Sequence, residues 1–239
     1  MVSTHVNFTE TERVTGEAFV RLATAADEFE AYVHPHATRI AKLADEVARA
    51  FHLGKQDRFS LRIAALAHDL GEVAMGREYI KRAGPLSDEE RLDLARHPVI
   101  GEQEAARSGA DRGAQLIVRW HQEWWNGAGY PDALQREEIP LPARILRVVD
   151  AYSALTDARP FRPARTTEEA RRHLKEWAGL EFDPQVVRAF LSLTERIELQ
   201  SYAHAEESLE SRLKTLEREL NSQPVVSDSK PQTTDSETL

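Results

Sequence analysis

The adjacent residues His68 and Asp69 are the pair of side chains in this sequence that most directly suggests chemistry. They stand at the end of the most apolar stretch, residues 58–70, which Gly71 follows directly. An isolated charge buried in such surroundings is costly, so the pair requires partners. A divalent metal ion is one such partner, because neutral imidazole and carboxylate suit iron, manganese and zinc. Taken alone, such a pair is more often a hydrogen-bonded core histidine followed by a capping aspartate.

Four further residues favour a metal site over a purely structural His-Asp pair. His36 begins one predicted helix, His97 ends another before Pro98, and His121 lies in a third. Asp150 falls within an apolar helical run, where an unpaired carboxylate would be costly. Helical bundles commonly build dinuclear metal sites from side chains that converge from successive helices. The residues that could converge in this way are His36, His68, Asp69, His97, His121 and Asp150.

The elements that must position these residues are predicted to be helices. Alternating apolar and polar runs typical of strands are almost absent, whereas helical periodicity recurs along the chain. Apolar residues in 36–52 fall on one face of a helix, and 58–70 is apolar almost all round, which predicts a central buried helix. The predicted fold class is therefore all-α, a helical bundle with a C-terminal helical extension.

Capping signals mark where several of these helices begin. Each signal is a side chain that can accept a first-turn N–H, or a proline at the first helical position. They are Ser87 with Glu90, Thr166 with Glu169, Asp183 with Pro184, and Pro142. Two segments rich in turn-forming residues, 71–86 and 126–141, are predicted to be loops between the helices.

The chain is predicted to consist of a main domain with extensions at both ends. Residues 1–29 form an N-terminal helical extension, 30–195 the domain, 196–220 a C-terminal helix and 221–239 a disordered tail. The C-terminal helix carries leucines at heptad-like spacing, at Leu209, Leu213, Leu216 and Leu220. This stripe is compatible with a homodimer formed through the helix, and equally with a terminal helix packed on the domain.

Composition excludes several classes of function. The sequence has no cysteine, which rules out disulfides, thiolate metal sites and cysteine nucleophiles. A net charge of −9 disfavours binding to a nucleic-acid polymer, whereas a small phosphorylated ligand at a metal site remains compatible with it. No run resembles a membrane span or a signal peptide, so we expect a cytoplasmic protein with no membrane contact.

The ordered set His36, His68-Asp69, His97, His121 and Asp150 resembles the HD superfamily of metal-dependent phosphohydrolases. It is most similar to the HD-GYP branch, known as bacterial cyclic-di-GMP phosphodiesterases. The similar segments include LAHDLGE at 66–72, HQEWWNGAGYPD at 121–132 and EEIPLPARILRVVDAYSALTDARPFR at 137–162. The resemblance covers roughly residues 30–195 and implies the all-helical HD-domain bundle.

The resemblance also implies a role for each matching residue. His36, His68, His97 and His121 would be metal ligands, Asp69 the bridging carboxylate and catalytic residue, and Asp150 the final ligand. The metals would be two divalent ions, iron or manganese first, with zinc, magnesium or nickel as alternatives. On the substrate side, the implied residues are Gln122, Tyr130, Arg159 and Arg162. Both arginines would hold substrate phosphate, for which the guanidinium fork is well shaped.

The sequence departs from the family pattern on the substrate side. The family usually has HDxGK, whose lysine is expected to meet the scissile phosphate, but the fifth position here is Glu72. A carboxylate there would repel an anionic substrate. The family usually has two adjacent histidines where this chain has His121 and Gln122, and the amide is a poor metal ligand.

Two other departures affect the number of metals and one loop. Some relatives carry a glutamate four residues before the first histidine, which supports a third metal. Tyr32 stands at that place, so we expect two metals. Ala133 and Arg136 replace loop glycines, and such a replacement can alter the path of the loop.

We therefore expect metal-dependent hydrolysis of a phosphodiester, with cyclic-di-GMP cleaved to linear pGpG or onward to GMP. Two alternatives stay open. One is a catalytically weak domain that senses a nucleotide or binds a signalling protein, which Glu72 and Gln122 favour. The other is an HD phosphohydrolase that acts on another phosphorylated substrate.

Overall fold

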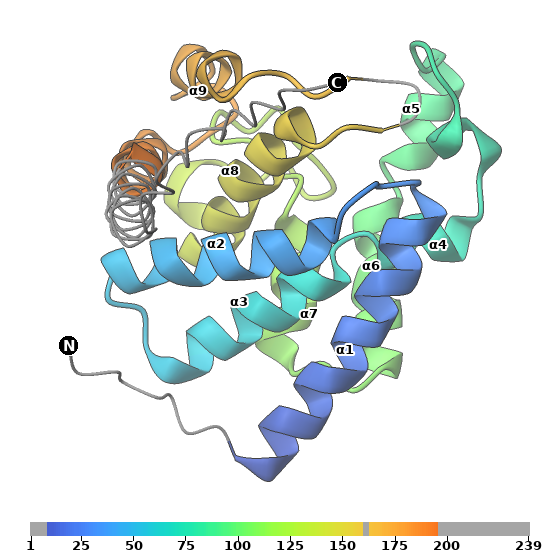
Figure 1. Ribbon diagram of the computed structural model, residues 1–239, viewed down its shortest axis with the longest axis vertical. Coiled ribbons are helices and arrows are strands. Elements are labelled where there is room, and N and C mark those ends of the chain that lie inside the picture. The colour runs from blue at the N-terminus through green and yellow to red at the C-terminus, as the bar shows by residue number, and fades with distance from the viewer. Residues whose placement is uncertain (1–8, 160–162, 196–239) are drawn as a thin grey trace, which may run out of the picture. The chain divides into compact units, whose positions relative to one another are not determined.

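The computed structural model describes residues 9–159 and 163–195, and these residues form a bundle of helices (Figure 1). The chain divides into two units, residues 1–194 and 195–239, and almost all of the second unit lies outside the described residues. The predicted helix over 196–220, its leucine stripe and the tail 221–239 therefore stay predictions. Among the described helices, none is long and apolar enough to cross a membrane.

The described elements follow one another as helices joined by short connections. They are α1 (Glu10–Phe29), α2 (His36–Ala50), α3 (Lys55–Ala67), α4 (Leu70–Met75), the 3-10 helix η1 (Glu78–Lys81), α5 (Asp88–Leu94), α6 (His97–Arg107), α7 (Arg112–Trp120), the 3-10 helix η2 (Arg136–Glu138), α8 (Leu141–Thr156) and α9 (Thr167–Glu176), followed by helical residues 184–195. No described element is a strand, and an isolated β-bridge joins Ala178 and Phe182. The all-α prediction is confirmed.

The predicted capping signals begin the helices as expected. Ser87 accepts a hydrogen bond from the N–H of Glu90 and caps α5, and Thr166 does the same from Glu169 at α9, both as complete capping boxes. The Asp183 carboxylate accepts from the N–H of Gln185, at the start of the helical residues 184–195.

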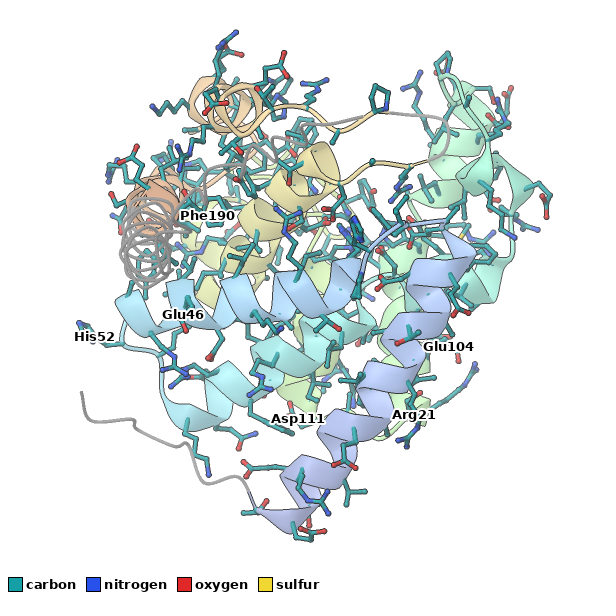
Figure 2. The ribbon with its side chains drawn as sticks, in the orientation of Figure 1. Arg21, Glu46, His52, Glu104, Asp111 and Phe190 are labelled. Atoms are coloured by element: carbon teal, nitrogen blue, oxygen red, sulfur yellow. The ribbon has the colours of Figure 1, made fainter. Side chains whose placement is uncertain are left out.

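The core is built around α3, which lies between α2 and α7 and also contacts α1, α6 and α8 (Figure 1). Leu61 and Ile63 on α3 are buried, as are Ile40 on α2 and Leu146 on α8. Figure 2 shows Phe190, on helical residues 184–195, directed towards the body of the bundle, where its ring packs edge-on against Tyr152. The predicted central buried helix is confirmed as α3, but it ends at Ala67 rather than at residue 70, and Leu70 begins α4.

Two sequence-based boundaries were wrong. Segment 71–86 is not a continuous loop, since α4 and η1 occupy much of it. Helix α4 has six residues and ends at Gly76 in the left-handed conformation, so it is too short to show periodicity. His97 does not end a helix but begins α6, with Pro98 in its first turn, and the preceding helix already stops at Leu94.

The close approach of α4 to α6 depends on Gly71. A Cβ atom on Gly71 would lie 2.0 Å from the carbonyl oxygen of His97 and 2.8 Å from the backbone nitrogen of Gly101. Both neighbours are backbone atoms, so they cannot yield as a flexible side chain would. A glycine at this position therefore lets the His68-Asp69 segment lie against the start of α6.

We expect Gly71→Ala to lower the free energy of unfolding by about 1–3 kcal/mol, because overpacking forces backbone shifts. Gly16→Ala is the matched control, since a Cβ on that α1 residue meets nothing within 4 Å. In a helix interior this control should be neutral or stabilise by up to about 1 kcal/mol. Denaturant unfolding measures both, and equal stabilities for the two variants would contradict the close-approach argument.

Candidate metal centre

Four histidines are buried at the centre of the bundle, on or beside α2, α3, α6 and α7. The exposed fractions of His36, His68, His97 and His121 are between 0% and 2%. His36 begins α2, His97 begins α6, and His68 and His121 directly follow α3 and α7. These are the histidines that the sequence predicted.

Each of the four imidazoles uses its Nδ1 atom for a hydrogen bond to the protein. The acceptors are the carboxylate of Asp157 for His36, at 2.7 Å, and the carbonyl oxygens of Ala65, Leu94 and Val118 for His68, His97 and His121, at 2.9, 2.8 and 2.6 Å. A carbonyl oxygen only accepts, so Nδ1 carries the proton and a neutral ring keeps its lone pair on Nε2. The protein thus fixes the tautomer that a metal ligand needs.

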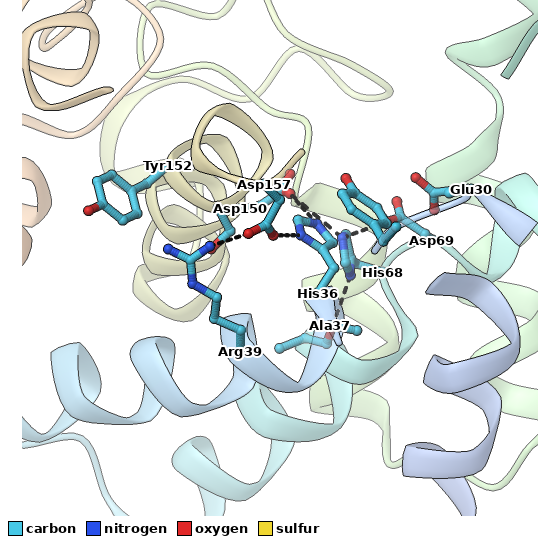
Figure 3. Close-up of polar contacts among 12 residues, drawn as sticks. Glu30, His36, Ala37, Arg39, His68, Asp69, Asp150, Tyr152 and Asp157 are labelled. Carbon is cyan, nitrogen blue, oxygen red and sulfur yellow. Dashed lines mark hydrogen bonds and ion pairs between the residues drawn. The ribbon is translucent and has the colours of Figure 1, made fainter. Parts of the chain in front are cut away.

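The Nε2 atoms point at one another and at two carboxylates. His97 Nε2 lies 3.2 Å from His121 Nε2, and His68 Nε2 lies 2.7 Å from Asp69 Oδ2. Asp150 Oδ1 is 3.7 Å from Nε2 of both His36 and His68. Figure 3 shows His36 and His68 directed into the space between Asp150 and Asp69.

Buried polar atoms in this cluster lack hydrogen-bond partners, which fits a bound cation. The Nε2 atoms of His36 and His68 are buried without a hydrogen bond, although His68 Nε2 is in ion-pair contact with Asp69. His97 and His121 face each other with lone pairs, an arrangement that needs a cation or a proton between them. Three groups have ligand atoms close enough to hold a metal, namely His36, His68 and Asp69; Asp69, His97 and His121; and Glu30, Asp69 and Glu72. The residues present therefore fit divalent metal binding, with Asp69 common to all three groups.

Electrostatics in the metal-free cluster favour the metal-binding forms of His121 and Asp150 at neutral pH, but not that of His68. Burial, together with the charges of neighbouring histidines, lowers the pKa of His121 to about 3, so its Nε2 lone pair stays available. For Asp150, burial opposes ionisation, but the contact with His36 and the charges of His68 and His36 together outweigh it and lower the pKa to about 2. Burial also lowers the pKa of His68, yet Asp69 and Asp150 more than offset this and raise it to about 10. A metal that binds His68 would therefore displace a proton.

A second layer of side chains holds His36. Asp157 accepts from His36 and is in turn paired with Arg39 on α2 (Figure 3). The ring of Tyr32 stacks on the His36 ring at 3.9 Å, nearly parallel. Carboxylates that orient a metal-binding imidazole make it a better ligand. Asp157 was not predicted, because its partner His36 is 121 residues away in the sequence and no local pattern indicates the contact.

The carboxylates of Glu30, Asp69 and Glu72 form an acidic cluster beside the histidines, within 4.8 Å of one another. Burial and the charge of Asp69 raise the pKa of Glu72 to about 8 in the metal-free protein. Glu30 is 2% exposed and pairs with Arg159 at 2.7 Å. Sequence reasoning missed Glu30, since it considered only the position of Tyr32.

A pocket of about 420 Å³ opens onto Asp69 and Asp150. Its lining includes the predicted substrate residues Gln122 and Arg159, and Glu72. The Arg159 guanidinium lies 3.9 Å from the centre of the Tyr32 ring and hydrogen-bonds the Tyr32 hydroxyl. Arg159 is therefore already engaged, and Arg162 lies outside the described residues.

The loop after α7 places Tyr130 next to the histidines, with its ring centre 6.2 Å from that of His97. Ala133 and Arg136 adopt left-handed backbone conformations, with φ of 54° and 52°. The replacement of loop glycines therefore leaves a backbone that still takes the conformation glycine favours.

Two other histidines of the described part, His52 and His173, lie in different surroundings. His52, after α2, points into solvent at the opposite end of that helix from His36 (Figure 2). His173 lines the pocket, although its sequence context gave no sign of a partner. Arg147, Tyr79 and Arg82 also line the pocket without having been predicted.

Comparison with known proteins gives a family and relatives. A family model described as HD domain matches residues 22–186. A cyclic di-GMP phosphodiesterase of Thermotoga maritima is 30% identical over 80% of this chain and 52% of its own length. The cyclic di-GMP phosphodiesterase response regulator RpfG of Xanthomonas campestris is 35% identical over 76% of this chain and 49% of its own length. The chain thus spans about half the length of these relatives.

Solved structures share the fold. A cyclic GMP-AMP-specific phosphodiesterase of Vibrio cholerae superposes with a TM-score of 0.64 at 19% identity, covering 78% of this chain and 50% of that one. An HDG"Y"P protein of Bdellovibrio bacteriovorus gives a TM-score of 0.58 at 17% identity, over 77% of this chain and 62% of that one. At these identities the likeness concerns the helical architecture.

We expect added Mn²⁺ to stabilise the chelator-treated protein, by about 2.7 kcal/mol at a metal concentration a hundredfold above Kd. His121→Ala should remove most of this gain, because its Nε2 atom faces that of His97. His34→Ala is the control, since His34 is exposed beside the buried ligand. Thermal unfolding and metal analysis provide the readouts. A melting temperature that does not respond to any divalent metal would refute the site.

Proposed function

Since this chain belongs to the HD-domain family, we propose that it hydrolyses a phosphodiester bond of a cyclic dinucleotide at a site that holds two divalent metal ions. Cyclic-di-GMP is the first substrate, cleaved to linear pGpG or onward to GMP, in keeping with the names of the relatives. The observation that carries the proposal is the convergence of four buried imidazoles, each with Nδ1 engaged, on Asp69 and Asp150 beside an open pocket.

We assign the two metal positions to the ligand groups that contain histidines. His36, His68 and Asp150 would hold one ion, His97 and His121 the other, and Asp69 would bridge them. Iron and manganese suit this set of nitrogen and oxygen ligands, with zinc, magnesium or nickel as alternatives. When bound, such a pair supplies a water activated as hydroxide and a clamp for phosphoryl oxygen.

The chain's own residues would bind and orient the substrate. Tyr130 forms a wall of the site beside His97, and Gln122 can donate or accept a hydrogen bond from the pocket lining. Arg159 is held by Glu30 and Tyr32, so its contribution to phosphate binding requires that it exchange or share these partners. The pocket of about 420 Å³ lies within the usual range for small-ligand sites.

The second candidate function is nucleotide binding without efficient turnover. The observation that favours it is the acidic cluster of Glu30, Asp69 and Glu72, which adds negative charge where an anionic substrate would approach. The third is hydrolysis of another phosphorylated compound, such as a mixed cyclic dinucleotide, for which some relatives are named.

Protein purified anaerobically and loaded with Mn²⁺ or Fe²⁺ should hydrolyse cyclic-di-GMP. Asp69→Ala should lower kcat by at least about a hundredfold, because loss of even an outer-shell partner of a metal ligand typically costs 10–100-fold. Chromatography of the products, with metal content measured alongside, gives the answer. Two bound metals without turnover of cyclic-di-GMP would favour a sensor, and a panel of cyclic dinucleotides would then identify another substrate.

Replacing the carboxylate of Glu72 should improve substrate binding. Glu72→Gln keeps the shape and removes the charge, and we expect KM for cyclic-di-GMP to fall by about tenfold, equivalent to about 1.4 kcal/mol. Glu72→Lys should lower KM at least as much, since a cation there attracts phosphate. Steady-state kinetics at constant metal content separate KM from kcat. A higher KM in both variants would mean that Glu72 assists the substrate.

A further inference from the structure

The pocket beside the metal centre is lined by more acidic than basic side chains. Its carboxylates are Glu30, Asp69, Glu72 and Asp150, and its guanidinium groups are Arg82, Arg147 and Arg159. A phosphate ester that enters the pocket needs hydrogen-bond donors that these carboxylates do not already occupy. Which arginine retains donors close to the predicted metals therefore decides how the substrate phosphate is held.

Two of the three arginines are occupied or distant from the histidines. Arg159 is paired with Glu30 and lies against the Tyr32 ring. Arg82 is bound to Glu90 on α5, and its side chain is 45% exposed. Neither residue is in contact with Asp150 in the described ion pairs.

Arg147, on α8, is placed differently. Its Nη2 atom is bound by Glu181, while Nη1 lies 3.7 Å from Asp150 Oδ2. The other oxygen of Asp150 faces Nε2 of His36 and His68, so a single carboxylate separates the Arg147 guanidinium from the predicted ligands. Within the described part, the Nε atoms of Arg147 and Arg159 are both buried without a hydrogen-bond acceptor, so what distinguishes Arg147 is its place beside Asp150. Glu181 engages Nη2, which leaves the Nη1 donors for a ligand.

The partner that holds Arg147 is itself fixed. Glu181 is 8% exposed, and its carbonyl oxygen accepts from the N–H of Trp125 at 3.0 Å. The neighbouring Leu180 accepts from Asn126 at 2.9 Å, which ties this turn to the loop that carries Tyr130. The guanidinium is therefore pre-positioned, and ordering it on binding costs little entropy.

We propose that Arg147 is a substrate-binding residue, whose Nη1 atom donates to a non-bridging oxygen of the phosphate held at the metal centre. Glu181 orients the guanidinium, and Asp150 keeps it turned towards the metals. The inference rests on the proposed phosphodiesterase site and adds to it the cation that offsets Glu72. A guanidinium stays charged at any working pH, and its planar, weakly hydrated cation suits phosphate oxygens.

Binding of inorganic phosphate to the Mn²⁺-loaded protein, measured by calorimetry, tests Arg147 without requiring turnover. Arg147→Gln should raise the Kd of phosphate at least tenfold with unchanged metal content. Arg147→Lys should give an intermediate loss and covers the case in which the glutamine variant fails to fold. Arg144→Gln is the matched control, because Arg144 lies on the same helix, is paired with Asp183, and has a side chain of the same 15% exposure. It should bind phosphate as the unmodified protein does.

Glu181→Gln distinguishes phosphate binding from a purely structural ion pair, because it breaks the same pair as Arg147→Gln. Phosphate affinity retained within threefold in Glu181→Gln and lost in Arg147→Gln supports the proposal. Equal losses in the two variants overturn it. Loss of metal from the Arg147 variants also overturns it, since Arg147 would then act by holding Asp150. Phosphate binding that depends on Arg147 in a protein inactive on cyclic dinucleotides would sustain this inference and refute the proposed substrate.

Discussion

The structure depends on one repeated interaction, in which an imidazole Nδ1–H donates to a carbonyl oxygen at the end of a helix. The last carbonyls of a helix have no intrahelical donor. His68, His97 and His121 each satisfy such a carbonyl three residues earlier, at the ends of α3, α5 and α7. The same bond turns each ring so that Nε2 points into the bundle. The hydrogen bond that satisfies the end of each helix therefore also orients the imidazole, and this occurs at three places.

Convergence of these rings also requires unusually close backbones. Gly71 lets the segment after His68 and Asp69 lie against the carbonyl of His97, and Gly101 faces Gly71 from α6. Gly129 does the same for the loop after α7, since a Cβ there would lie 2.2 Å from the backbone nitrogen of Trp124. These glycines therefore determine how closely the backbones approach, and the rings of His68, His97 and His121 pack between them.

The sequence predicted those parts of the site whose signals are local. Helix starts were readable from Ser87 and Thr166, and Asp150 stood out as a buried polar residue in an apolar run. The ordered histidines carried the family resemblance, and the HD-domain match bears it out. Residues that act across long separations gave no such signal. The Glu30–Arg159 pair spans 129 residues and the His36–Asp157 contact 121, so only the folded chain reveals them.

The acidic balance of the pocket has a consequence for the order of events. The metal-free pocket is lined by four carboxyl groups and three arginines, but the raised pKa of Glu72, about 8, leaves that carboxyl mostly protonated at neutral pH. Two divalent ions would favour its ionised form and add positive charge beside it, and a metal bound at His68 would also displace its proton. Metal loading therefore changes the charge that a phosphate meets in the pocket, and with it the strength of phosphate recognition. In the metal-free protein Asp150, 3.7 Å from Nη1 of Arg147, competes with a phosphate for this guanidinium. A metal bound by Asp150 would weaken that competition, so Arg147 would bind phosphate better once the metals are bound.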